Sequence, residues 1–158
     1  MNNNPYLSII IPTFNRKDLL KLCLKALFRQ RPLTKDCEII VVDDGSTDRT
    51  EELVKSLIND SPCFLQYFRH EHKGPAAARN IGIRNAKGKV ILFLGDDIIA
   101  EEHLLEEHYK FHMQAPENNA LLGLIKWHPD LKINSFMDFL SRDIQFGYRH
   151  IKDKEDLP

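Results

Sequence analysis

The sequence lacks the features of several protein classes. No apolar run reaches the roughly 18–20 residues that a membrane-spanning helix needs, and no basic segment precedes the first apolar stretch, as a signal peptide would require. Lys and Arg number 22 against 23 Asp and Glu, so the basic excess typical of nucleic-acid binding is missing. We therefore expect no nucleic-acid partner, no membrane span in this chain and a cytoplasmic location, with peripheral membrane association left open.

Cysteine is scarce, and its spacing fits no metal motif. The three residues Cys23, Cys37 and Cys63 form no C-x-x-C pair. This pattern predicts reduced, buried thiols in a protein of the cytosol. A dinucleotide fingerprint, G-x-G-x-x-G, does not follow the first apolar run, which argues against a Rossmann dehydrogenase. Repeats, low-complexity segments and linkers are also missing, so residues 1–158 are expected to form a single domain.

What the chain does contain is an alternation of apolar runs and helical patterns. Continuous apolar runs predict strands, and apolar residues spaced three and four apart predict amphipathic helices. The expected strands are Leu7–Ile11, Cys37–Asp43, Phe64–Arg69, Val90–Gly95 and Ala120–Ile125. The expected helices are Arg16–Gln30, one that follows Gly45, Pro75–Ala86, Glu101–Gln114 and Asn134–Asp143. This order predicts an α/β fold with a mostly parallel, doubly wound sheet and flanking helices.

Two helix starts carry capping residues. Asn15 is a suitable N-cap for the first helix. Asp48, with Glu51 three residues later, resembles a capping box with Asp in place of Ser or Thr. Gly74 followed by Pro75 is a typical start for the third helix.

Polar residues follow the carboxyl ends of the expected strands, where ligands bind in open parallel sheets. Four loops are concerned: Pro12, Thr13, Asn15 and Arg16 in the first, Asp43 and Asp44 in the second, Gly74 and Arg79 after the third, and Asp96 and Asp97 after the fourth. Each motif alone also fits a turn or a helix cap. Together they fit a nucleoside diphosphate with a divalent cation, because carboxylates are the ligands that Mg²⁺ or Mn²⁺ prefers and basic groups bind phosphate.

Three stretches of the sequence resemble the successive motifs of family 2 glycosyltransferases with the GT-A, Rossmann-like fold. They are SIIIPTFNR, EIIVVDDGSTDRT and GPAAARNIGIRNAKGKVILFLGDDI, in the family's order and spacing over about the first hundred residues. The resemblance covers the nucleotide-binding half of such a domain. It implies a nucleotide-sugar donor, UDP-, GDP- or dTDP-linked, a divalent cation (Mn²⁺ or Mg²⁺), and a glycan or lipid-linked acceptor.

The resemblance also implies a role for each loop. Pro12, Thr13, Asn15 and Arg16 would contact the nucleoside or lie beside it. Asp44 would accept a hydrogen bond from the base, with Asp43 supporting it or touching the nucleoside. Gly74 and Arg79 would face the nucleotide and its phosphates. Asp97 would bind the metal and Asp96 the ribose or sugar, while Gly95 stands where the family often has a further acid.

The family inverts the anomeric centre in one displacement, with a base from a Glu-Asp type element in the second half of the domain. We recognise no such element here, so the catalytic residue is unknown and expected after Pro158. The chain is thus expected to be a GT-A domain that stops before its acceptor half, binding donor with weak or no transfer on its own.

Two other interpretations stay open at this point. The stretch IIVVDDGS is also similar to the acidic pocket of a receiver domain, with Lys126 as its lysine, although the acidic pair would then be expected after the first strand. The chain would otherwise be a silent fragment that associates through an exposed apolar surface, as a homo-oligomer or with another partner.

Overall fold

The computed structural model describes residues 4–31, 36–115 and 118–143. The chain divides into two compact units, residues 1–119 and 120–158, and each is described by itself. The single domain expected for residues 1–158 stays a prediction.

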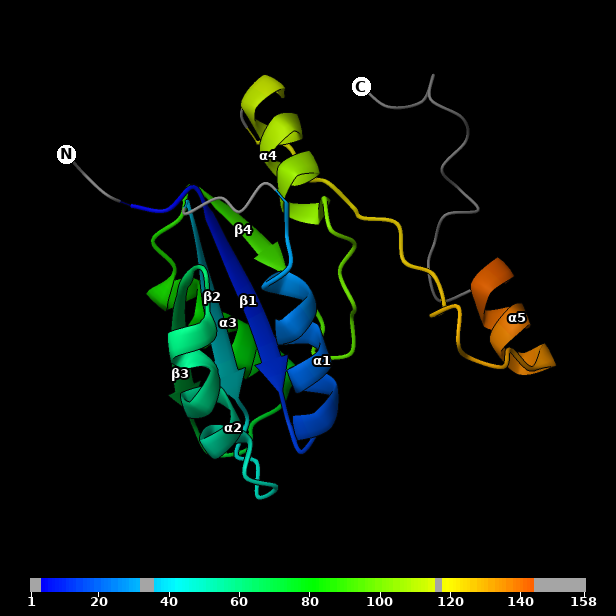
Figure 1. Ribbon diagram of the computed structural model, residues 1–158, viewed down its shortest axis with the longest axis horizontal. Helices are drawn as coiled ribbons and strands as arrows, with labels where there is room; N and C mark the ends of the chain where they lie inside the picture. Colours follow the sequence, from blue (N-terminus) through cyan, green and yellow to red (C-terminus); the bar gives the residue numbers. More distant parts are fainter. Residues whose placement is uncertain (1–3, 32–35, 116–117, 144–158) are drawn as a thin grey trace. The chain divides into compact units, whose positions relative to one another are not determined.

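The first unit is built on a four-stranded sheet whose strands all run parallel. Its strands are β1 (Leu7–Thr13), β2 (Cys37–Asp43), β3 (Phe64–Arg69) and β4 (Val90–Phe93), in the order β3-β2-β1-β4. β1 pairs with β2 along its whole length, and Leu7 to Ile10 pair with β4. The predicted parallel sheet is confirmed. β1, β2 and β3 end together at one edge, the lower one in Figure 1, whereas β4 ends three residues earlier, at Phe93 opposite Ile10.

Helices cover both faces of this sheet. Those of the first unit are α1 (Lys17–Leu27), α2 (Thr50–Leu57) with the short 3₁₀ helix η1 (Ile58–Asp60), α3 (Pro75–Asn85) and α4 (Leu104–Gln114). In Figure 1, α1 and α2 lie on one face of the sheet and α3 lies on the other. The second unit contains α5 (Ser135–Asp143), close to the helix expected there.

The core divides into two layers because side chains of a strand point alternately to either face. Ile9 and Ile11 of β1 belong to the larger cluster with α1 and α2. Ile10, between them, packs with Ile40 and Ala78 on the α3 side. Each fully buried side chain of this size stabilises the fold by about 1.5–3 kcal/mol. Continuous apolar strands are therefore required here, since both faces are covered.

A buried polar network fixes the connection that leads into β4. The carboxylate of Glu38 accepts hydrogen bonds from the Ser8 hydroxyl (2.6 Å), the Lys87 N–H (2.6 Å) and the Gln66 amide (2.9 Å). The Ser8 hydroxyl oxygen in turn accepts the N–H of Gly88 at 2.8 Å. A buried carboxylate is tolerated when its lone pairs are filled in this way. The network thereby sets where β4 starts, and with it where Asp96 and Asp97 emerge.

Two strand predictions need correction. β4 ends at Phe93 and is an edge strand, with Phe93 48% exposed, because α3 covers β1 and β2 rather than β4. The strand expected at Ala120–Ile125 is wrong, since these residues have no regular structure. A strand needs a neighbour for its backbone hydrogen bonds, and the only regular element among described residues 118–143 is α5.

The predicted N-caps are also wrong in detail. Arg16 and Arg49 occupy the N-cap positions of α1 and α2, with no capping hydrogen bond from their side chains. Asn15 adopts a left-handed conformation, φ 52°, which Asn tolerates better than most residues. Asp48 instead accepts the N–H groups of Lys17 (2.9 Å) and Thr50 (3.2 Å), and so serves the first turns of both helices. The predicted start of α3, Gly74 followed by Pro75, is confirmed.

The expectation of three reduced thiols is wrong for two of them. Cys37 and Cys63 form a disulfide, while Cys23 is free and buried. The pairing follows from strand register, because Glu38 and Phe64, the next residues along the chain, are partners across β2 and β3. The two Cα atoms are therefore 5.7 Å apart. The sequence separation of 26 residues gave no sign of this neighbourhood.

No helix in residues 4–31, 36–115 and 118–143 has both the length and the apolar character needed to cross a membrane.

Gly82 is the point of closest approach between α3 and the sheet. A Cβ built there would overlap the side chain of Ile10, which is fully buried and β-branched. We expect Gly82→Ala to lower the free energy of unfolding by about 1–2 kcal/mol, because overpacking outweighs the better helix propensity of Ala. Denaturant unfolding measures the change. The control is Gly123→Ala, where the added Cβ meets nothing within 4 Å; a Gly82→Ala protein as stable as the parent would contradict the packing described.

Candidate functional site

The loops at the carboxyl ends of the four strands are joined to one another by hydrogen bonds. The Thr13 hydroxyl donates to Asp96 (2.8 Å), which links the loops after β1 and β4. The Asn15 N–H donates to the Ser46 hydroxyl (2.8 Å), and the Thr47 N–H donates to the Asn15 side chain (2.7 Å), which links the loops after β1 and β2. The expected convergence of these loops at one sheet edge is thus what the structure shows.

The acidic pair after β4 has one buried and one exposed member. Asp96 is 5% exposed, and burial raises the pKa of its carboxyl, against the opposing effects of the Thr13 hydroxyl and of Arg16. Asp97 keeps 52% of its side chain exposed. The Arg16 guanidinium nitrogen Nη1 lies 3.4 Å from Asp96 Oδ1 and 3.3 Å from Asp97 Oδ2. A positive group, the guanidinium of Arg16, therefore lies beside both carboxylates.

Asp43 is a supporting residue rather than an exposed one. It is buried, and its carboxylate accepts the Ser46 N–H (2.7 Å) and the Tyr67 hydroxyl (2.5 Å). Burial, together with the hydrogen bond to Asp43, raises the pKa of Tyr67 far above its usual value, so the phenol stays a donor. These contacts shape the turn after β2.

Asp44 ties this turn to the loop before α3. Its carboxylate accepts the N–H groups of Lys73 (2.8 Å) and Gly74 (2.9 Å), and His72 Nδ1 and His70 Nε2 lie at 2.7 and 3.3 Å. Burial raises the pKa of Asp44, but the two N–H donors and the nearby histidines outweigh burial and lower the pKa overall. Asp44 is therefore held as a carboxylate, and it fixes the backbone of residues 72–74.

The remaining predicted residues differ in how they take part. Pro12 lies in β1 opposite Val42 and is half-buried. Gly74 has φ 88°, a conformation that Gly adopts without strain, and a Cβ there would point into open space. Arg79 is exposed on α3 and forms no ion pair with any residue that the structure describes. Arg79 is thus the predicted site residue least engaged in this constellation.

Two aromatic rings were missed among the predicted site residues. Phe14 and His72 stack with ring centroids 4.2 Å apart and planes at 23°, and both are exposed. They bring together the loop after β1 and the loop before α3. The available signal was an exposed aromatic within an otherwise polar loop, Pro12 to Arg16. Such a pair offers a flat face on which a nucleobase can stack.

The carboxylates of Asp96 and Asp97 fit a divalent cation that takes only one or two ligands from the protein. Water and a bound phosphate would supply the other ligands. No group of three or more His, Cys, Asp or Glu suited to a metal occurs in the described part of the chain. Mg²⁺ is usually held by one or two carboxylates together with substrate phosphates. Asp97, with an exposed carboxylate, meets that requirement, and Asp96 beside it adds negative charge.

Cys23 lies beneath this edge but is not reactive. Its Sγ is 3.5 Å from the carbonyl oxygen of Gly95. Burial, with the charges of Asp96 and Asp97, raises the pKa of the Cys23 thiol to about 12. A thiol of this kind stays protonated and acts as a small core residue.

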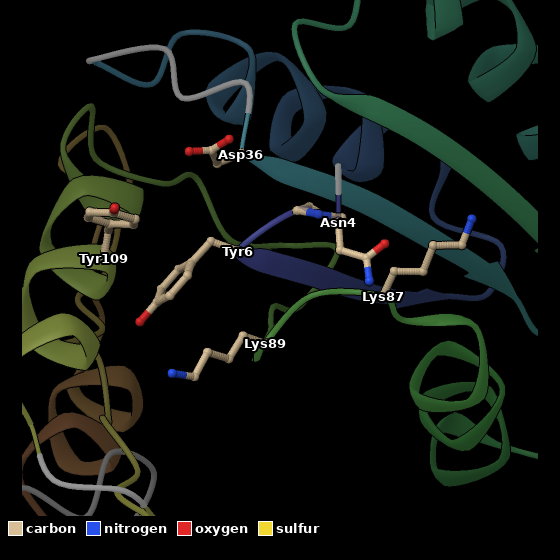
Figure 2. Close-up of a pocket in the computed structure, with 7 residues that line it drawn as sticks. Asn4, Tyr6, Asp36, Lys87, Lys89 and Tyr109 are labelled. Carbon is tan, nitrogen blue, oxygen red and sulfur yellow. The ribbon is translucent and has the colours of Figure 1, made fainter. Parts of the chain in front are cut away.

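A hollow of about 400 Å³ lies at the other end of the strands (Figure 2). Lys87 and Lys89 line it together with Tyr6 and Tyr109, whose rings meet edge to face at 4.8 Å. None of the predicted site residues contributes to it. We therefore place the functional site at the carboxyl edge, where the polar loops converge, and not in this hollow.

Comparison with known proteins gives consistent matches. The family model described as Glycosyl transferase family 2 matches residues 8–155. An uncharacterized glycosyltransferase of Rickettsia conorii is 38% identical over 132 residues, which are 84% of this chain and 20% of that protein. Chondroitin synthase of Escherichia coli is 36% identical over 141 residues, 86% of this chain and 19% of the synthase. The chain therefore spans only about a fifth of these two relatives.

Solved structures match the described fold as well. S. aureus TarS 1–349 in complex with UDP has a TM-score of 0.63 and 29% identity, over 68% of this chain and 32% of that one. The mannosyltransferase PcManGT from Pyrobaculum calidifontis, in complex with GDP-Man and Mn²⁺, has a TM-score of 0.63 and 26% identity, over 72% and 33%. The fold is GT-A, as the sequence predicted, and the residues present form part of such a domain.

The family model covers nearly the whole chain, residues 8–155, and therefore includes all four loops that converge at the sheet edge. This agreement decides against the receiver and dehydrogenase interpretations. The chain belongs to glycosyl transferase family 2.

Proposed function

We propose that this chain binds a nucleotide-diphosphate sugar together with a divalent cation, as the donor-binding part of an inverting glycosyltransferase. The observation that carries the proposal is the pairing of a buried acid with an exposed acid, Asp96 with Asp97, where the four loops meet. Relatives of the same fold have been solved with UDP, with UDP-GlcNAc, and with GDP-Man and Mn²⁺. These complexes support the donor class, and the sugar and base stay unassigned.

We assign different roles to the two acids because one is exposed and the other is buried. Asp97 would bind the cation, because its carboxylate is open to solvent and to a bound diphosphate. The Thr13 hydroxyl donates to Oδ2 of Asp96 and so orients its carboxylate. Asp96 would therefore contact the ribose or sugar through its other oxygen, Oδ1. A bound cation would stabilise the negative charge that grows on the leaving diphosphate.

The nucleoside would lie across the loops after β1 and β2. Pro12, Thr13 and Asn15 would form the surface on which the nucleoside lies. The buried carboxylate of Asp43 would hold the turn after β2 in place. The acceptor positions of Asp44 are filled by Lys73, Gly74 and the histidines. A hydrogen bond from the base to Asp44 would therefore replace the contact that His72 makes with this carboxylate.

The phosphates would be bound from the side of α3. Gly74 lets the backbone approach closely at the start of this helix, where N–H groups favour anions. Arg79, unpaired within the described part of the chain, has a guanidinium suited to a phosphate. Arg16, already beside the acidic pair, is the other basic group of the site.

Transfer to the acceptor, a glycan or a lipid-linked hydroxyl, needs a general base. The four acids of the site are committed to the donor, its metal or the loops themselves. We infer that none of these four carboxylates is the base, which would come from the acceptor half of the domain. The chain alone would then bind donor well and transfer sugar weakly or not at all.

Metal dependence tests the proposal. We expect UDP or GDP to bind with Mn²⁺ and to lose about tenfold or more in affinity in Asp97→Asn, since removing a metal-site group has at least that effect. Isothermal titration calorimetry measures the nucleotide affinity of the parent and of Asp97→Asn, once with Mn²⁺ and once with EDTA. Asp60→Asn, an exposed Asp in η1, removes the same charge elsewhere and should change nothing. Equal nucleotide affinity in Asp97→Asn and the parent, with or without EDTA, would refute the assignment.

The aromatic pair is tested separately from the metal. Phe14→Ala should weaken nucleotide binding by about 1–3 kcal/mol, the range for a lost base–aromatic stack. Phe14→Tyr keeps a ring and should bind as the parent does. Leu22→Ala, an exposed apolar residue on α1, is the matched truncation away from the site. An unchanged affinity in Phe14→Ala would show that the base does not lie on this pair.

A further inference from the structure

Arg16 lies beside Asp96 and Asp97, the two carboxylates next to which the proposed divalent cation would bind. Its Nη1 nitrogen is 3.4 Å from Asp96 Oδ1 and 3.3 Å from Asp97 Oδ2, so one guanidinium group contacts both carboxylates. The side chain is 53% exposed and comes from the N-cap residue of α1. Its backbone therefore lies at the start of a helix, and its side chain is accessible to a ligand.

No other Lys, Arg or His forms an ion pair with either carboxylate among the residues that the structure describes. Asp96 is buried, and its other oxygen, Oδ2, accepts the Thr13 hydroxyl. Adjacent carboxylates repel each other, and the repulsion is larger where one of them is removed from water. Among the described residues, Arg16 is thus the group that balances this charge.

Building on the proposed donor site, we propose that Arg16 is a resident counter-ion of the Asp96–Asp97 pair, which a divalent cation must displace in order to bind. The guanidinium and the cation would compete for the carboxylate of Asp97, whose Oδ2 lies 3.3 Å from Arg16. A divalent cation such as Mg²⁺ binds a carboxylate oxygen directly. A guanidinium that stayed beside the same carboxylate would be repelled by the cation.

Displacement gives the released guanidinium a new partner. A diphosphate bound at the cation presents oxygens that match the planar fork of Arg. Metal alone would then lose the Arg16 ion pairs without compensation, whereas metal with diphosphate would replace them. Arg16 therefore makes cation binding depend on the nucleotide, and it disfavours the loading of bare metal.

The test measures Mn²⁺ binding without nucleotide, from the electron paramagnetic resonance signal of free Mn²⁺, on the 158-residue chain. Arg16→Gln should bind Mn²⁺ about two- to fivefold more tightly than the parent, the fold-change that a partly exposed ion pair is worth. The same variant should bind UDP or GDP with Mn²⁺ about tenfold more weakly, because a charge-assisted hydrogen bond to phosphate is lost. A purely structural role of Arg16 would not move the two affinities in opposite directions.

Two further variants keep the result interpretable. Arg16→Lys retains the charge and should bind Mn²⁺ within about twofold of the parent, because an exposed ion pair contributes little that depends on its detailed geometry. Asp97→Asn should bind no Mn²⁺. Thermal unfolding of each variant confirms that the fold is intact.

Equal or weaker Mn²⁺ binding in Arg16→Gln would overturn the counter-ion role, and so would the absence of Mn²⁺ binding in both proteins. Nucleotide titrations run in parallel separate this failure from that of the donor site. If UDP or GDP binds the parent but Arg16→Gln has the same Mn²⁺ affinity as the parent, only the counter-ion role fails. If neither nucleotide binds under any condition, the proposed function fails with it.

Discussion

The hydrogen bond from the Thr13 hydroxyl to the buried carboxylate of Asp96 is the contact on which the site depends. It joins the ends of β1 and β4, neighbours in the sheet, and fixes the orientation of an acid that is almost fully removed from water. Because Asp96 is held in this way, Asp97 is directed outward at the next position. The buried network around Glu38, at the opposite end of the same two strands, sets the register that makes this contact possible.

A second buried carboxylate, that of Asp44 after β2, also connects two loops. Asp44 accepts two N–H groups from the loop before α3 and holds that loop against the turn after β2. Buried acids thus serve as connectors between loops, since a carboxylate can accept several hydrogen bonds at once. In the proposed site, exposed groups would bind the ligand: Asp97, Arg16, Arg79 and the stacked pair of Phe14 and His72.

The sequence allowed the sheet and the convergence of the loops to be predicted, because continuous apolar strands and the polar residues that follow them are local patterns. It did not allow the edge position of β4 to be predicted, since its apolar residues look the same whether or not a helix covers them. The disulfide was missed because strand register, not sequence spacing, brings Cys37 and Cys63 together. Arg16 was expected beside the nucleoside, but its bridge across both acids is a property of side-chain placement that no motif encodes.

Amide hydrogen exchange tests most directly whether the four loops at the carboxyl edge of the sheet form one donor site. UDP or GDP with Mn²⁺ should slow exchange in residues 12–16, 44–47, 72–79 and 95–98 together. Exchange in residues 87–90, at the opposite end of the sheet, should not change. Protection confined to that opposite end, or no protection at nucleotide concentrations that saturate binding, would show that these loops do not form a donor site.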